Sequence, residues 1–181
     1  DEDLINVVSG TSLKLELKGM RYTEGDDALE IQVGQLLREK GVTVATAESC
    51  TGGEIAHLLT SVPGSSDYFK GSVVAYANEV KVNVLGVNPA DIEREGVVSE
   101  PVVLQMAEGV RRVMGTDYAV ATSGVAGPAG GTPEKPVGTV WIGVATPRGC
   151  FARKYVFSFT RERNIAKAAA KALELLSMEM V

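Results

Sequence analysis

The chain has 181 residues, of which 45% are hydrophobic and 23% are charged, so it is long enough to form one domain with a substantial core. Its net charge of −5 argues against direct nucleic-acid binding as its main role. The sequence contains no apolar run of about 18 residues, the length needed to cross a membrane as a helix. Two cysteines and one histidine exclude a disulfide framework and a multi-histidine metal site, and we expect a cytoplasmic protein.

Residues 1–26 differ in pattern from the rest of the chain. Short strands are predicted over 5–8 and 13–17, with small polar residues forming a turn between them. The chain begins at Asp1 rather than at a methionine, and we interpret 1–26 as a linker or remnant of an upstream domain. The domain itself is expected over 27–181.

From residue 27 onward, apolar patterns of helical and strand period alternate. Helices are predicted over 27–40, 51–62, 78–85, 89–95, 99–114 and 162–180. Strands are predicted over 42–47, 69–76, 117–122, 138–146 and 151–159. The last two strands are separated by a short turn and should form an antiparallel hairpin. This alternation predicts a three-layer α/β/α sandwich, an α/β fold whose mixed sheet is mostly parallel.

The junction between the first of these strands and its helix is the most informative part of the sequence. Thr51 and Glu54 have the spacing of a capping box, which predicts that Thr51 is the N-cap of the helix. The backbone N–H groups of Gly52, Gly53 and Glu54 would then point out of the helix start, where they could bind an anion or a developing oxyanion. We therefore expect Thr51, Gly52 and Gly53 to contact a substrate.

Two nucleophilic side chains, Ser49 and Cys50, lie beside this helix start. Ser49 is the favoured nucleophile, although a serine before a helix commonly hydrogen-bonds to the backbone of a turn or helix start. For Cys50 the alternative is a small buried residue without a chemical role, as is common for a lone cysteine. The only histidine, His57, lies two turns away. The alternative base is Lys81, which can act if burial lowers its pKa, with Tyr76 hydrogen-bonding to it or relaying a proton.

A glycine-dense loop over 122–132 follows a buried strand. Glycines let the backbone approach a ligand closely, although this loop lacks the Walker and dinucleotide-binding spacings. The loop residues that we expect to contact a substrate are Ser123, Gly124, Ala126, Gly127 and Gly131. At the start of the last helix, either Arg161 or Arg163 could hold a phosphate group through its planar guanidinium.

Five sequence motifs together resemble a known family. They are TAESCTGG at 46–53, YANEVK at 76–81, GVVSEPV at 96–102, TSGVAGP at 122–128 and KPVGTV at 135–140. In this order they resemble the CinA C-terminal domain family, the nicotinamide-nucleotide amidohydrolases. The resemblance implies hydrolysis of the carboxamide of nicotinamide mononucleotide to nicotinate mononucleotide and ammonia. That reaction recycles the pyridine nucleotide released by bacterial DNA ligase.

The resemblance also implies roles for individual residues. The family's serine falls on Ser49, its lysine on Lys81 and its tyrosine on Tyr76, and its phosphate-binding arginine falls on Arg163. No metal or cofactor is implied, whereas a homo-oligomer and an upstream domain in the full-length protein are. The alternative is a non-catalytic nucleotide-binding or regulatory domain of a larger competence/damage-inducible protein. The presence of the serine, tyrosine and lysine together favours the enzyme.

Overall fold

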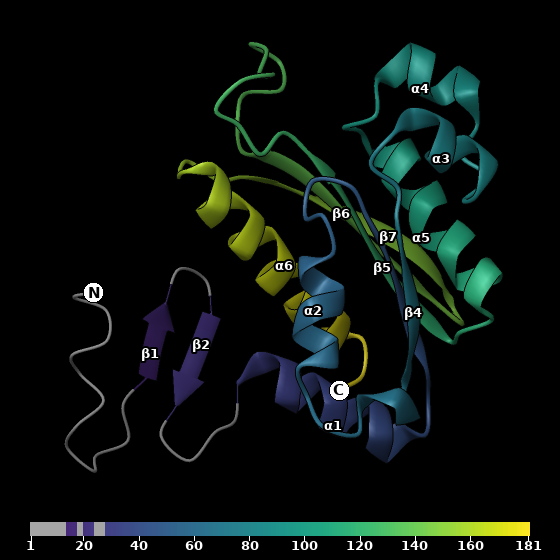
Figure 1. Ribbon diagram of the computed structural model, residues 1–181, viewed down its shortest axis with the longest axis vertical. Helices are drawn as coiled ribbons and strands as arrows, with labels where there is room; N and C mark the ends of the chain where they lie inside the picture. The colour runs from purple at the N-terminus through teal and green to yellow at the C-terminus, as the bar shows by residue number, and fades with distance from the viewer. Residues whose placement is uncertain (1–13, 18–19, 24–27) are drawn as a thin grey trace.

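A five-stranded mixed sheet forms the centre of the molecule (Figure 1). The computed structural model describes residues 14–17, 20–23 and 28–181. The strands of the sheet are β3 (Val44–Glu48), β4 (Phe69–Val74), β5 (Tyr118–Gly124), β6 (Thr139–Thr146) and β7 (Gly149–Val156). They lie in the order β4-β3-β5-β6-β7. β3 is parallel to β4 and β5, whereas β6 is antiparallel to β5 and β7. Only β6 therefore runs against the others, and the predicted mixed, mostly parallel sheet is confirmed.

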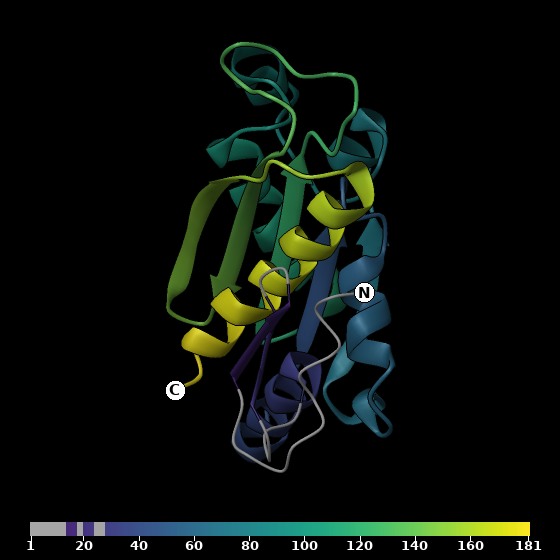
Figure 2. The same cartoon turned by 90° about the vertical axis from the view of Figure 1, so that its left-hand side faces the viewer.

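Helices cover both faces of this sheet, which confirms the predicted three-layer α/β/α sandwich (Figures 1 and 2). One face is covered by α1 (Leu29–Lys40), α2 (Glu54–Thr60) and α6 (Arg161–Met178). The other face is covered by α5 (Glu100–Met114), with the short helices α3 (Asn78–Asn83) and α4 (Pro89–Glu95) beside it. A turn of 3-10 helix, η2 (Ser65–Asp67), precedes β4. The helix predicted over 51–62 is shorter than expected, since α2 begins at Glu54.

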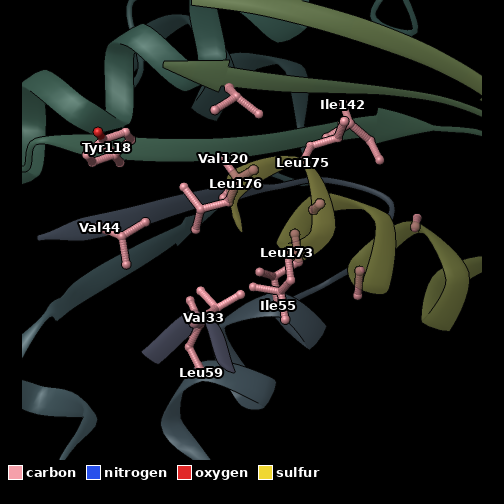
Figure 3. Close-up of a cluster of buried hydrophobic side chains, with 14 of the residues drawn as sticks. Val33, Val44, Ile55, Leu59, Tyr118, Val120, Ile142, Leu173, Leu175 and Leu176 are labelled. Atoms are coloured by element: carbon pink, nitrogen blue, oxygen red, sulfur yellow. The ribbon is translucent and has the colours of Figure 1, made fainter. Parts of the chain in front are cut away.

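The two faces of the sheet differ in the size of their side chains. Positions facing α1, α2 and α6 carry larger residues, such as Val44, Val120 and Ile142 (Figure 3). Positions facing α5 are mostly alanine, including Ala119 and Ala121 on the same strand as Val120. Successive residues of a strand point to opposite faces, so β5 contributes to both layers of the core.

The N-terminal part of the chain forms a separate pair of strands. β1 (Lys14–Leu17) pairs antiparallel with β2 (Met20–Thr23). β1 confirms most of the strand predicted over 13–17, whereas the strand predicted over 5–8 lies outside the described residues. Among the residues that the structure describes, we find no helix with the length and apolar character needed to cross a bilayer.

Candidate active site

The carboxyl ends of the parallel strands β3, β4 and β5 meet at one edge of the sheet, the upper edge in Figure 1. Ser49 follows β3 directly, Tyr76 lies two residues beyond β4, and Gly124 ends β5. A cavity of about 340 Å³ opens at this edge. It is lined by Ser49, Cys50, Tyr76, Val97, Val98, Gly124, Val125, Ala126, Gly127, Ala129, Gly130 and Arg161. This is the position that ligands occupy in open α/β sheets.

Ser49 and Lys81 form a hydrogen-bonded pair, with Lys81 Nζ 3.1 Å from Ser49 Oγ. Lys81 lies on α3 and is only 1% exposed. Its amine also donates to the carbonyl oxygen of Ala75 at 2.7 Å and to that of Tyr76 at 3.2 Å. Burial in this setting lowers the pKa of the Lys81 amine. An amine with a lowered pKa, held against a hydroxyl, can take up the proton of that hydroxyl.

Burial also keeps the side chain of Cys50 uncharged. Its side chain is 7% exposed, and burial raises the pKa of the thiol to about 12. The thiol therefore stays protonated near neutral pH, and a protonated thiol is a poor nucleophile. His57 is exposed on α2. The chemistry at this edge therefore favours Ser49 as the nucleophile and Lys81 as its base.

The prediction that Thr51 caps the helix after β3 is wrong. The N-cap of α2 is Gly53, and Gly52 and Gly53 both have positive φ angles, 58° and 103°. These left-handed residues turn the chain further before helical hydrogen bonding begins. The amides of Gly52 and Glu54 donate within the turn, to the carbonyls of Ser49 and Thr51. The amides of Gly52 and Glu54 are therefore not free to bind an oxyanion, contrary to the prediction. None of the three expected substrate contacts, Thr51, Gly52 and Gly53, lines the cavity.

The start of α2 is capped instead by Glu48, a fully buried residue that the sequence analysis missed. Glu48 Oε1 accepts hydrogen bonds from the Thr51 hydroxyl at 2.7 Å and from the Ile55 amide at 2.9 Å. Glu48 Oε2 accepts from the Ala56 amide at 2.9 Å. A carboxylate at a helix start satisfies amides that lack helical partners. The available signal was an acidic residue at the end of an otherwise buried strand.

The predicted hydrogen bond between Tyr76 and Lys81 is present, but Lys81 donates to the Tyr76 carbonyl oxygen and not to the phenol. The Tyr76 side chain is 64% exposed, and its hydroxyl accepts a hydrogen bond from Arg161 Nη2 at 3.3 Å. Arg161 Nη1 also donates to the carbonyl oxygen of Gly127 at 2.8 Å. Arg161 therefore joins the tyrosine to the glycine-rich loop beside the cavity. Arg163, which the resemblance favoured, is not among the lining residues.

The glycine-rich loop forms a large part of the cavity wall. Three of its predicted residues line the cavity, namely Gly124, Ala126 and Gly127, whereas two do not, Ser123 and Gly131. Ser123 is buried, and its hydroxyl donates to the carbonyl oxygen of Val97 at 2.8 Å. This bond ties the end of β5 to Val97, which lines the cavity together with Val98.

Asn164 is a second residue that the sequence analysis missed. It lies in the first turn of α6, is 1% exposed, and donates from Nδ2 to the carbonyl oxygens of Ala126 and Phe159 at 3.0 and 3.1 Å. Its Oδ1 accepts from the Phe159 amide at 3.1 Å. Asn164 thereby ties the loop to the helix start that carries Arg161. The available signal was a polar residue four positions before Ala168, on the buried face of the helix.

Across the described ranges, from 14–17 through 20–23 to 28–181, no three His, Cys, Asp or Glu side chains converge in a way that could hold a metal ion. The fold and the site together define the class. The molecule is a three-layer α/β protein in which a serine lining a cavity at the carboxyl edge of the parallel strands contacts a buried lysine.

Comparison with known proteins identifies the family. The model of the CinA C-terminal domain family matches residues 26–180, and the chain belongs to this family. It is 55% identical to the CinA-like protein of Desulfosudis oleivorans over 161 residues, which cover 88% of this chain and 39% of that protein. It is also 55% identical to the CinA-like protein of Salinibacter ruber over 150 residues, 83% of this chain and 36% of that protein. The chain thus spans about two fifths of the length of these relatives.

Solved structures show the same relation. A CinA superfamily protein from Klebsiella pneumoniae matches with a TM-score of 0.81 at 33% identity, covering 84% of this chain and 95% of that chain. The competence/damage inducible protein CihA from Agrobacterium tumefaciens matches with a TM-score of 0.78 at 36% identity, covering 83% and 94%. The structural likeness therefore extends over nearly all of each solved chain.

Proposed function

We propose that this chain hydrolyses the carboxamide of nicotinamide mononucleotide to nicotinate mononucleotide and ammonia. The observation that carries the proposal is the 3.1 Å contact between the buried Lys81 Nζ and the Oγ of Ser49, which lines the cavity at the sheet edge. Burying an ionisable amine costs free energy, and a domain that only binds nucleotides has no need for one beside a serine. The family relation supports the same chemistry.

Lys81 acts as the base in its neutral form. A neutral amine has two N–H groups and one lone pair. The carbonyl oxygens of Ala75 and Tyr76 accept the two N–H groups, which leaves the lone pair for the hydroxyl proton of Ser49. In this form the hydrogen bond between the two side chains runs from Ser49 to Lys81. The lowered pKa of Lys81 brings the neutral form closer to physiological pH.

The reaction then proceeds through an acyl-enzyme. Ser49 Oγ attacks the carboxamide carbon and its proton passes to Lys81, which delivers that proton to the departing nitrogen as ammonia leaves. Water next attacks the ester carbon and gives a proton to Lys81, which returns it to Ser49 Oγ as the carboxylate is released. Backbone amides of the cavity wall, at Cys50 and along 126–127, are our candidates for stabilising the oxyanion in both steps.

The remainder of the substrate is assigned to the outer part of the same cavity. Its volume of about 340 Å³ is in the range that suits a small-molecule ligand. Arg161 is our candidate for the phosphate group, because its guanidinium borders the cavity and a planar fork suits phosphate. Cytoplasmic recycling of pyridine nucleotides, self-association and an upstream domain in the whole protein are part of the same proposal.

The test is ammonia release from nicotinamide mononucleotide, without added metal, by the parent chain and by Ser49→Ala. We expect the substitution to abolish release while nucleotide binding persists. Ser66→Ala, which alters an exposed serine of η2, is the matched control and should retain parent activity. Substantial release by Ser49→Ala would refute the nucleophile. Nucleotide binding by a parent chain that releases no ammonia would favour a regulatory domain instead.

A further inference from the structure

Glu48 is the buried charged residue that the mechanism above does not use. It is fully buried at the end of β3, immediately before Ser49 in the chain. Besides its contacts with the turn and with α2, its Oε2 accepts from the hydroxyls of Thr46 at 3.2 Å and Ser72 at 3.4 Å. A buried carboxylate costs free energy unless hydrogen-bond donors surround it, and Glu48 has such donors on both carboxylate oxygens.

The two partners of the proposed catalytic pair follow neighbouring parallel strands, whose ends are joined by the Ala75 amide donating to the Glu48 carbonyl at 2.8 Å. Lys81 is held by the carbonyls of Ala75 and Tyr76, which follow β4. Ser49 is held in the turn after β3, where its amide donates to the carbonyl of Thr122 on β5 at 3.1 Å. The distance between Lys81 Nζ and Ser49 Oγ therefore depends on how the turn after β3 is placed relative to α3.

Glu48 closes that turn. Its carboxylate reaches past the turn, receiving the Thr51 hydroxyl from within it and the Ile55 and Ala56 amides from the first turn of α2. Residues 48–56 thus form a loop whose two ends are joined through one side chain. Gly52 and Gly53, both at positive φ, give this loop conformational freedom that the carboxylate contacts restrict.

We propose that Glu48 is a positioning residue that sets the contact between Ser49 and Lys81 by closing the turn onto the start of α2. The inference rests on the proposed function, in which this contact performs the proton transfer. A displacement of about 1 Å in such a pair costs on the order of 100-fold in rate. Among the described residues, the Glu48 side chain makes no hydrogen bond to Ser49 Oγ or to Lys81, so in this proposal it acts through the backbone.

The test compares the parent chain with Glu48→Gln. Glutamine has the same shape, but its NH₂ group would face a backbone amide, donor against donor. The first readout is the rate at which a fluorophosphonate modifies Ser49, located by mass spectrometry with Ser49→Ala as the blank. In that reaction Ser49 Oγ bonds to phosphorus, the P–F bond breaks, fluoride leaves and Lys81 takes the hydroxyl proton. The second readout is kcat and KM for ammonia release.

A matched control separates positioning from ordinary cap stability. Asn88 caps α4, where its side chain accepts from the Ala90 amide at 2.9 Å, away from the cavity. We expect Asn88→Ala to lower Tm by about 2–4 °C with parent rates of labelling and turnover. For Glu48→Gln, assayed well below its Tm, we expect labelling and kcat to fall about 100-fold while KM changes by less than about threefold.

The outcomes distinguish a positioning role of Glu48 from a role in helix capping alone. Parent rates in folded Glu48→Gln would overturn the positioning role and leave Glu48 as a cap only. If Glu48→Gln does not fold, Thr51→Val removes one donor to the same carboxylate, and we expect its labelling rate to fall about tenfold; an unchanged rate would overturn the proposal. A parent chain with neither labelling nor turnover would refute the Ser49–Lys81 nucleophile itself, and the role of Glu48 with it.

Discussion

Replacing Lys81 by methionine should remove the base while keeping a side chain of similar length in the same buried position. Lys81 Nζ lies 3.1 Å from Ser49 Oγ, and the proposed mechanism uses it in both half-reactions. General base catalysis contributes about 10²–10⁴-fold, and we expect a loss at the upper end of that range because both steps are affected. A 10⁴-fold loss in kcat corresponds to about 5.4 kcal/mol of transition-state stabilisation.

The assignment of Lys81 as the base also predicts how activity and stability change with pH. The neutral amine is the active form, so kcat/KM of the parent should rise with pH. Because burial lowers the pKa of Lys81, this rise should be centred below about 10.4, the value of an exposed lysine. Between the lowered pKa and about 10.4, the unfolded chain binds more protons than the folded one, so the free energy of unfolding should also increase with pH. Both effects should be absent in Lys81→Met.

The assay is steady-state ammonia release across pH, together with urea unfolding of the same proteins. Lys70→Met is the control, since Lys70 is exposed at the opposite end of β4 from the site. The double variant Ser49→Ala/Lys81→Met should be no slower than the slower single variant, because the two residues act as one unit. A Lys81→Met protein with kcat within about tenfold of the parent would refute the assignment of Lys81 as the base.

Three further predictions concern other residues. Arg161→Ala should raise KM for nicotinamide mononucleotide more than tenfold, because it removes a charge-assisted contact of about 1.5–3 kcal/mol. Arg163→Ala should leave KM within about twofold of the parent value. A larger effect of Arg163→Ala than of Arg161→Ala would favour Arg163 as the phosphate contact. Tyr68→Phe should raise the free energy of unfolding in urea by about 1 kcal/mol, because the buried Tyr68 hydroxyl has no hydrogen-bond partner in the described structure; an equal loss would contradict this. Gly109→Ala should lower Tm, since a Cβ there would lie 2.0 Å from the carbonyl oxygen of Leu85 and such overpacking costs about 1–3 kcal/mol; an unchanged Tm would show that α5 can shift at no cost.

Periodicity was sufficient to predict the layers of the fold. The apolar face of α5 and the continuously apolar start of β5 both follow from burial, which the sequence records directly. The same patterns placed Ser49 just beyond one strand and Tyr76 at the end of another, and because the carboxyl ends of these strands meet, both residues line one cavity. Helix and strand ends were less accurate because they depend on local backbone angles.

The details of the site required tertiary structure. The Thr51–Glu54 spacing fits a capping box, yet two left-handed glycines moved the helix start and the Glu48 carboxylate took the first amides of the helix. The hydrogen bond from the Ile55 amide to Glu48 joins residues seven positions apart, a longer separation than a local capping pattern spans. The choice between Arg161 and Arg163 likewise depended on which side of the helix start faces the glycine-rich loop.

The proposed base, Lys81, is held by main-chain atoms. Lys81 donates to the carbonyls of Ala75 and Tyr76, and every amino acid has a carbonyl, so no exchange of a side chain at either position deletes these acceptors. The Tyr76 side chain, by contrast, is exposed beside the cavity. Substitutions there can change the lining of the cavity while the contacts of Lys81 are preserved. For the proposed enzyme, this arrangement would combine mutational robustness in the chemistry with evolvability in the substrate range.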